Sequence, residues 1–361
     1  MTILINIIIF ILILSVIVAI HEFGHFIFAK LMGVYVYEYA IGMGPRIFSF
    51  KPKKSETVYS LRAIPLGGFC SLAGEDTEND DEEEVPKNMR LQSKKPWQRF
   101  LIMFSGPGFN FLLAIIILFS IALFCGGTTY DPIIDGVTKN TPAHEVGLEK
   151  GDRIVKIDNH KIKTIDDVSL YLTVADKTKG TTIKVEKAGT GKVEEYKIKP
   201  KKIVKDKKTG YVYGLSLKSE KTKGFVNACK YTFVKTNSLF RQMFVTIESL
   251  FTGKVSVNQL SGPVGIYSIV SEQAKSGFAN LMYLMAYLSI NVGFLNLLPI
   301  PAFDGGHILF ILIELIRRKP VKPEVENTIH TVGLCLLMLL MIYVTINDIC
   351  LLYTSPSPRD R

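Results

Sequence analysis

Residues 3–29 read ILINIIIFILILSVIVAIHEFGHFIFA, which places an HExxH motif inside an apolar run long enough to span a bilayer. On a helix, side chains four residues apart share one face, so His21 and His25 can hold one metal ion while Glu22 carries protons beside it. His21 would lie roughly 14 Å inside Lys30, the first cation of the chain. Ionisable side chains at that depth are costly without a partner, which favours a buried metal site over a helix end that merely faces water.

The composition fits a membrane protein with a sizeable soluble part, because 48% of the residues are hydrophobic and 21% are charged. The net charge is +10, but no basic stretch is interleaved with aromatic residues, which argues against a nucleic-acid partner. The five cysteines are scattered and odd in number, so structural disulfides are not expected. No Lys or Arg precedes the apolar run and no small-residue cleavage site follows it, so we expect the first helix to be retained.

Four apolar segments are long enough to span a bilayer, at residues 3–29, 100–125, 278–300 and 328–352. The short loop between the last two carries four cations, Arg317, Arg318, Lys319 and Lys322. Short cation-rich loops stay in the cytoplasm, so this loop sets the topology. It predicts that residues 30–99 are also cytoplasmic, and that both termini and the long segment 126–277 lie outside.

The segments between the spans differ in pattern. Residues 34–74 alternate apolar and polar side chains with frequent Gly and Pro, which predicts short strands, and Glu75–Glu84 is an acidic run expected to be a solvated loop. Residues 130–220 look like a small soluble domain of strands. Residues 224–251 are apolar but interrupted by charges, which suits a helix on the membrane surface. The tail 353–361 is too polar and proline-rich to pack.

A catalytic zinc ion usually takes three protein ligands and leaves one position for water, so HExxH needs a third ligand from elsewhere. His144 and His160 fall in the soluble domain predicted to lie outside and cannot reach the first helix. His330 begins the last span without a companion motif and is interpreted as an interfacial side chain. The remaining candidate is Asp304, in the segment 296–307.

The segment 296–307 reads NLLPIPAFDGGH and ends the third span. Its two prolines break the helix, and unpaired backbone at membrane depth is tolerated only beside a protein-enclosed or watery cavity. If residues 305–316 are helical, Asp304 lies roughly 20 Å from the Arg317 cluster, a depth comparable to that of the HExxH motif. A turn at the membrane surface is the alternative. His307 is expected to serve as an outer-shell or structural residue rather than as a fourth ligand.

These motifs together resemble the site-2 protease family of intramembrane zinc metalloproteases, and in particular its bacterial RseP/RasP-like branch. The matching elements occur in family order, namely HEFGH at 21–25, GMGP at 42–45, GPGFN at 106–110 and NLLPIPAFDGGH at 296–307. Phe303 departs from the leucine that the family most often has, and this change leaves the proposed ligands untouched. The resemblance covers essentially residues 1–352.

The resemblance implies a set of site residues. The implied roles are zinc (Zn²⁺) ligands for His21, His25 and Asp304, the catalytic acid/base for Glu22, and substrate positioning for Asn296, Asn110, Gly42 and Gly44. It also implies that the strands of residues 34–70 offer an edge to which an unwound substrate segment adds as a further strand.

Residues 126–205 resemble a PDZ domain. The telling stretch is TPAHEVGLEKGDRIVKID at 141–158, where a Gly-x-x-x-Gly-Asp turn joins an apolar helix to an apolar strand. Such a domain usually captures extended or C-terminal peptides, and in this family its implied use is as a size filter over the membrane site. A role as a mere spacer stays open.

The expected fold is a polytopic α-helical membrane protein with four transmembrane helices, a cytoplasmic membrane-associated β region and an extracytoplasmic PDZ domain, in the bacterial inner membrane. The predicted segments are the first span (1–33), the cytoplasmic β region (34–96), the second span (97–125), the PDZ domain (126–205), the post-PDZ segment with a surface helix (206–277), the third span (278–303), the metal-ligand segment and cytoplasmic loop (304–327), the fourth span (328–352) and a disordered tail (353–361).

The expected function is hydrolysis of peptide bonds within or near transmembrane segments of single-pass membrane proteins, such as anti-sigma factors or signal-peptide remnants. A catalytically silent scaffold that presents a PDZ module would lack a ligand or Glu22, and none is missing. A zinc protease that cuts outside the bilayer would need an HExxH motif with a third ligand near it in a soluble domain, and the sequence has none. A metal-ion transporter would need a relay of intramembrane carboxylates.

Overall fold

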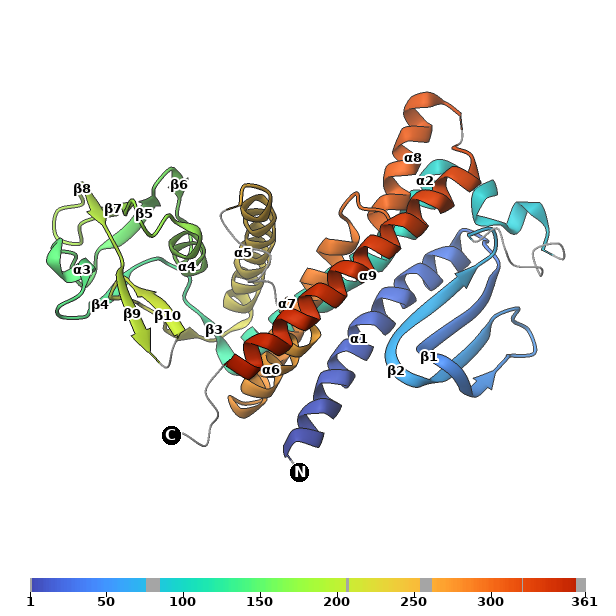
Figure 1. The fold of residues 1–361 in the computed structure, drawn as a ribbon, viewed down its shortest axis with the longest axis horizontal. Coiled ribbons are helices and arrows are strands. Elements are labelled where there is room, and N and C mark those ends of the chain that lie inside the picture. Colours follow the sequence, from blue (N-terminus) through green and yellow to red (C-terminus); the bar gives the residue numbers. More distant parts are fainter. Residues whose placement is uncertain (1, 76–84, 206–207, 254–261, 320, 355–361) are drawn as a thin grey trace. The chain divides into compact units, whose positions relative to one another are not determined.

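The computed structural model describes residues 2–75, 85–205, 208–253, 262–319 and 321–354. Within these ranges, four helices are long and apolar enough to cross a membrane (Figure 1). They are α1 (Thr2–Leu31), α2 (Pro96–Ile121) with its π-helical continuation Ala122–Gly126, α7 (Phe278–Asn296) and α9 (Pro323–Thr354). The four predicted spans are therefore found as helices.

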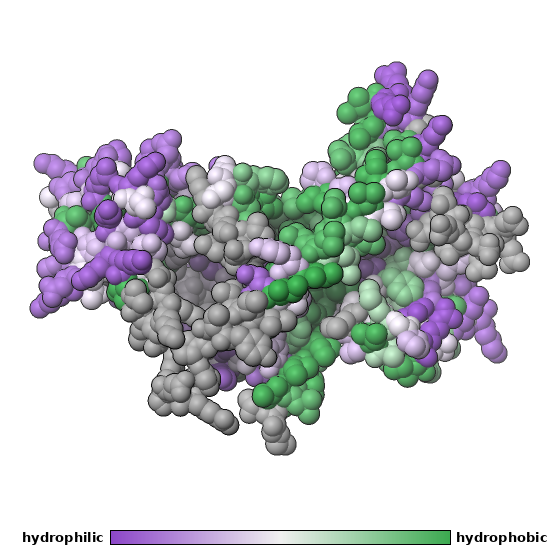
Figure 2. Space-filling model, in the orientation of Figure 1, coloured by the Kyte–Doolittle hydropathy of each residue, from purple (hydrophilic) through white to green (hydrophobic). Residues whose placement is uncertain are grey.

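The outer faces of these helices are apolar. Large apolar side chains on α1 and α9 are exposed, among them Leu4, Leu12, Leu336 and Leu339, and the helices form a hydrophobic band in Figure 2. A continuous apolar surface of this kind is unfavourable in water and suits a bilayer.

The helix boundaries around Asp304 follow the prolines of the sequence. Helix α7 ends at Asn296, and α8 (Asp304–Arg317) begins at the candidate ligand, as the two prolines between them predict. Helix α9 differs from its prediction at both ends, since it begins at Pro323 and continues to Thr354. The first two residues of the predicted tail are therefore helical, because the apolar pattern of α9 carries the helix past residue 352.

The chain forms two structural units, residues 1–117 with 262–345, and residues 118–261 with 346–361. The first unit contains the strands predicted after the first span, β1 (Val36–Phe50) and β2 (Val58–Leu72), which pair into one sheet. Residues 38–41 of β1 have partners in both arms of β2, at 58–61 and at 68–71. The chain segment 68–72 has no other strand partner among the described residues, so it is an edge of this sheet.

The sheet is bent and fastened to α1. Gly42 and Gly44 have φ angles of +89° and +80°, which glycine adopts at little cost and which let β1 turn midway. The hydroxyl of Tyr39 donates a hydrogen bond of 2.9 Å to the Ala19 carbonyl, and the Tyr39 ring lies 5.3 Å from that of Phe26. The sheet is therefore held against the helix that carries HExxH.

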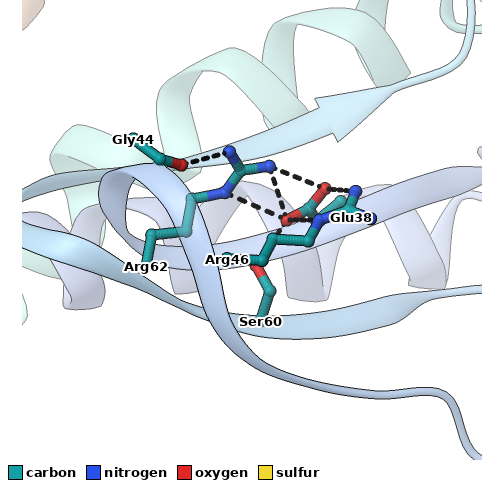
Figure 3. A network of polar contacts seen from close by, with 5 residues as sticks. All are labelled: Glu38, Gly44, Arg46, Ser60 and Arg62. Carbon is teal, nitrogen blue, oxygen red and sulfur yellow. Dashed lines mark hydrogen bonds and ion pairs between the residues drawn. The ribbon is translucent and has the colours of Figure 1, made fainter.

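A buried carboxylate holds the bend of the sheet (Figure 3). Glu38 accepts hydrogen bonds from Arg46 and Ser60, and Arg62 Nη2 donates to both of its oxygens at 2.9 and 3.0 Å. The other end of the Arg62 guanidinium donates to the Gly44 carbonyl at 2.8 Å, so the network spans the glycine turn. Burial alone would raise the pKa of Glu38, but the bonds from Arg46, Ser60 and Arg62 outweigh it and lower the pKa.

Replacement of Glu38 by glutamine should loosen this sheet. Removal of the charge that both arginines share should cost roughly 2 kcal/mol, seen as about 30-fold faster amide hydrogen exchange over residues 36–72 in nanodiscs. In the wild type, because the folded pKa is lowered, the stabilisation is complete above the ordinary carboxyl range and is lost only as the pH falls through the lowered pKa. Glu56→Gln removes a more exposed pair with Lys30 and should change exchange little. Equal exchange in both variants would contradict the role of Glu38.

The second unit contains the predicted soluble domain. Its elements include β4 (Ile134–Val137), α3 (Pro142–Glu145), α4 (Ile165–Val174) and a four-stranded sheet of order β6-β5-β7-β8. The strands of that sheet are β5 (Arg153–Ile157), β6 (His160–Lys161), β7 (Thr181–Glu186) and β8 (Val193–Ile198). Further pairs are β9 (Lys201–Lys205) with β10 (Lys208–Val212), β11 (Leu215–Leu217) with β4, and β12 (Lys221–Thr222) with β3 (Gly127–Thr128). Strands therefore run through the predicted soluble segment 130–220, and the pair of β12 with β3 lies just outside it.

Helix α5 (Phe225–Phe251) corresponds to the predicted surface helix and packs against α4 in the same unit. Lys235 donates to Asp166 at 2.8 Å, and Arg241 Nη1 donates to both oxygens of the buried Asp167 at 2.7 Å. Helix α6 (Pro263–Lys275) belongs to the first unit. The acidic run predicted at Glu75–Glu84 lies outside the described residues except for Glu75.

Candidate metal centre

The three candidate ligands meet inside the first unit. His21 Nε2 and His25 Nε2, one helical turn apart on α1, are 3.2 Å from each other. Asp304 Oδ2, at the start of α8, lies 3.1 Å from His21 Nε2 and 3.5 Å from His25 Nε2. Both histidines are buried, with 7% of their surface exposed. The three ligand atoms therefore form a nearly equilateral triangle.

Hydrogen bonds to the Nδ1 atoms of both histidines orient their Nε2 atoms towards Asp304. His25 Nδ1 lies 2.9 Å from the Ile102 carbonyl, which can only accept, so the proton is on Nδ1 and Nε2 keeps its lone pair. The Asn110 amide lies 3.2 Å from His21 Nδ1, and its Oδ1 is buried without a hydrogen-bond partner among the described residues. A 180° flip of the Asn110 amide exchanges Oδ1 and Nδ2 without changing its shape, so Oδ1 accepts a hydrogen bond from Nδ1–H of His21. The Nε2 atom of His21 then keeps its lone pair as well.

These atoms fit a zinc ion. Two imidazole lone pairs and a carboxylate oxygen converge, and Asp304 Oδ2 is buried with no hydrogen-bond partner among the described residues. Three electron-pair donors this close repel one another unless a cation lies between them. Tetrahedral zinc with bonds of about 2.0–2.1 Å separates its ligand atoms by about 3.3 Å, close to the separations at this site.

Glycines allow the helices to approach closely at the site. A Cβ atom at Gly106 of α2 would lie 2.2 Å from His25 Nε2 and 2.9 Å from His21 Cε1, so only glycine leaves room for both rings. A Cβ atom at Gly24 of α1 would lie 2.4 Å from the Ser105 carbonyl oxygen, so the two backbones touch directly. The GPGFN motif of α2 and the HEFGH motif of α1 therefore pack against each other.

The catalytic candidate Glu22 faces a cavity of about 510 Å³ that the three ligands also line. Residues 69–72 of β2 and residues 302–303 complete its wall. The backbone of Cys70 hydrogen-bonds the Glu22 carboxylate, and a Cβ atom at Gly68 would lie 3.6 Å from Glu22 Cγ. The edge of the sheet therefore borders the metal site directly.

A metal-ligand triad beside a carboxylate and a cavity is the arrangement of a metal-dependent hydrolase. The model of peptidase family M50 matches residues 9–340 of the chain, which includes every residue of this centre. The chain belongs to peptidase family M50.

Relatives carry matching names. A protein of Clostridium perfringens named zinc metalloprotease is 38% identical, covering 93% of this chain and 96% of its own length. A protein of Staphylococcus aureus (strain COL) with the same name is 34% identical, covering 97% and 99%. The regulator of sigma-W protease RasP of Bacillus subtilis is also 34% identical, covering 95% and 98%. As an M50 peptidase, the chain is a zinc-dependent metalloprotease of the membrane.

A second cavity extends the M50 site. It has a volume of about 400 Å³ and shares Glu75 and His307 with the first cavity. Its other walls carry charged side chains, including Arg99 and Glu314, which form an ion pair of 2.8 Å between α2 and α8. Apolar side chains such as Met103 and Phe310 also line this cavity, and its charged groups can hydrogen-bond water, which peptide hydrolysis at a buried metal requires.

The structure brings most of the predicted site residues together. Besides Glu22 and the three ligands, Asn110 contacts His21, and Asn296 Nδ2 lies 3.5 Å from His21 Nε2. Gly42 and Gly44 do not line the catalytic cavity among the described residues, and they shape the bend of β1 instead.

Sequence reasoning missed two partners of the site. Nothing in the sequence indicated the role of the Ile102 carbonyl, because every residue carries a backbone carbonyl. His330 was interpreted as an interfacial side chain, and its contact with the site was not predicted: its Nδ1 accepts a hydrogen bond of 3.1 Å from the Ala302 backbone, which lines the cavity. A signal existed, since Glu326, His330 and Gly333 share one face of α9 by their spacing, and polar residues in a span need partners.

Proposed function

We propose that this chain hydrolyses peptide bonds within or near transmembrane segments of single-pass membrane proteins. The observation that carries the proposal is the convergence of Asp304 with His21 and His25 beside Glu22, where the last three stand on α1, a helix long enough to cross a bilayer. A site built at that depth serves substrates that are themselves in the membrane.

We assign the chemistry as follows. Zinc, when bound by His21, His25 and Asp304, lowers the pKa of a coordinated water and polarises a peptide carbonyl. Glu22 accepts the proton of the attacking water and delivers it to the leaving amine. Its bond to the Cys70 backbone holds the carboxylate at the cavity wall. Asn296 and Asn110, which contact His21 from two sides, orient the site and the substrate.

The substrate is expected to bind as a strand. A helical segment shields its carbonyls in its own hydrogen bonds, so it must unwind before cleavage. Residues 68–72 border the cavity and have one strand partner among the described residues, so their free edge supports strand addition by the unwound segment. This arrangement would present a carbonyl of the added strand near Glu22.

We propose the topology predicted from the charges, with the 34–96 region and the Arg317 loop in the cytoplasm and the second unit outside, in the bacterial inner membrane. The strands and the α4 helix of the second unit are compatible with a PDZ domain that admits only clients already trimmed outside. The name of one relative, regulator of sigma-W protease, supports anti-sigma factors as a client class, with signal-peptide remnants as another.

Metal removal tests the proposal. Purified full-length protein in detergent should cleave a single-pass model substrate with a helix-breaking residue at mid-membrane, and mass spectrometry should place the cut inside the membrane segment. Treatment with 1,10-phenanthroline should abolish cleavage, and zinc should restore it, while the non-chelating 1,7 isomer should have no effect. Cleavage that survives chelation, or that maps only to the soluble ends, would contradict the proposal.

A further inference from the structure

One face of α9, the last membrane helix, contacts the turn before Asp304 and the first turn of α8. Glu326, His330 and Gly333 are spaced at i, i+4 and i+7 on α9, so they share that face. Each contacts a different residue of the 301–307 turn. The inference drawn from these contacts rests on the proposed role of Asp304 as the third zinc ligand.

His330 holds the turn just before the ligand. Its Nδ1 accepts the backbone N–H of Ala302 at 3.1 Å. Ala302 has a φ of +80°, a conformation that a residue with a Cβ atom adopts only when its surroundings enforce it. Because Ala302 lies two residues before Asp304, the backbone angle enforced there determines where the Asp304 carboxylate points.

The tautomer of His330 shows which function its ring serves. Since Nδ1 accepts a hydrogen bond from the Ala302 N–H, the proton of the neutral ring is on Nε2. His307, Glu326 and His330 bring their ligand atoms within 4.8 Å of one another, but this tautomer gives a metal ion no lone pair at Nε2. Nε2 has no hydrogen-bond partner among the described residues. The bond to Ala302 is therefore the polar interaction that a histidine supplies at this position.

The flanking contacts hold the turn on both sides of Asp304. A Cβ atom at Gly333 would lie 2.4 Å from Pro301 Cβ, so α9 packs directly on the proline before Ala302. Past the ligand, His307 Nδ1 lies 3.1 Å from Glu326 Oε1, and the His307 ring stacks on that of His330 at 3.9 Å.

We propose that His330 is a positioning residue for the metal centre, because it fixes the Ala302 backbone. Together with Glu326 and Gly333 of α9, it sets the orientation of the Asp304 carboxylate towards the zinc ion. The residue touches neither metal nor substrate. Its effect should therefore show first in metal affinity and ligand geometry, and cleavage should fall as a consequence.

Three substitutions at His330 separate this role from simple packing. Asn places its Oδ1 where Nδ1 lies and can accept the Ala302 N–H; Gln carries its acceptor one bond farther, and Leu has none. Zinc dissociation constants come from competition with a chromogenic chelator, and ligand geometry from the visible spectrum of the cobalt-loaded full-length protein. We expect His330→Leu and His330→Gln to weaken zinc binding about 10–100-fold and to alter the cobalt spectrum, and His330→Asn to retain both within about threefold.

Two controls make the outcomes distinguishable. Thr331→Leu introduces the same side chain at the next, exposed position of α9 and should leave zinc affinity unchanged. Asp304→Ala should lose zinc affinity; if it binds zinc as the wild type does, the ligand assignment of the proposed function is wrong. If Asp304→Ala weakens binding but His330→Gln and His330→Asn bind zinc equally with the same cobalt spectrum, the positioning role is overturned. A Leu variant that fails to fold leaves the comparison of Asn with Gln decisive.

Discussion

Replacement of Glu22 by glutamine should abolish cleavage and leave the zinc in place. The amide preserves the size of the side chain and can still accept the Cys70 hydrogen bond, but it cannot take a proton from water. Loss of a general acid/base typically slows such a reaction by about 10²–10⁴-fold, so turnover should fall below detection in most assays. Zinc content by mass spectrometry and cleavage of the single-pass model substrate, both on purified protein in detergent, measure the two properties separately.

Glu272→Gln is a matched control, because Glu272 is an exposed residue of α6 and the same chemical change there should affect neither property. Retained turnover in Glu22→Gln would show that another group moves the proton. Loss of zinc together with activity would instead assign Glu22 a structural part in the metal centre, and either result would overturn the mechanism.

Replacement of Gly106 by alanine should destroy the metal centre through a single methyl group. The added Cβ would lie 2.2 Å from His25 Nε2, closer than non-bonded atoms approach, so the ring must turn away from the metal or α2 must separate from α1. His25 would then lose its place in the triad. We expect zinc affinity to fall at least about 100-fold, with cleavage lost to the same extent.

Gly108 provides the comparison on the same helix. A Cβ atom there would lie 3.6 Å from Phe104 Cε1, which is ordinary contact, so Gly108→Ala should keep both zinc and activity. Circular dichroism should show the same helix content in both variants. If Gly106→Ala binds zinc normally, the close packing of α2 on the histidines is not required for the centre.

The residues that cost most to bury are those whose proximity in the structure the sequence predicted. His21, Glu22 and His25 stand in a run of aliphatic residues, and Asp304 follows two prolines at the end of another, so each needed a partner in the membrane. That requirement pairs the segments without any knowledge of the fold. The helix bounds near the site follow from the two prolines between α7 and α8.

Contacts made by backbone atoms were beyond sequence reasoning. The Ile102 carbonyl orients His25, and the Cys70 backbone holds Glu22, yet any residue type could supply these groups. The strands of residues 36–72 were predicted from their alternation, but the double pairing of residues 38–41 depends on the bend at Gly42. The contact of His330 with Ala302 was not predicted, because a single polar residue near a helix end was considered alone.

The order of the ligands along the chain has a consequence during synthesis. His21 and His25 stand on α1, whereas Asp304 and the His330 face that contacts its turn follow only after α2 and α7. A nascent chain that ends before α8 thus carries two of the three proposed ligands. The proposed metal centre is therefore complete only after α8 has been synthesised.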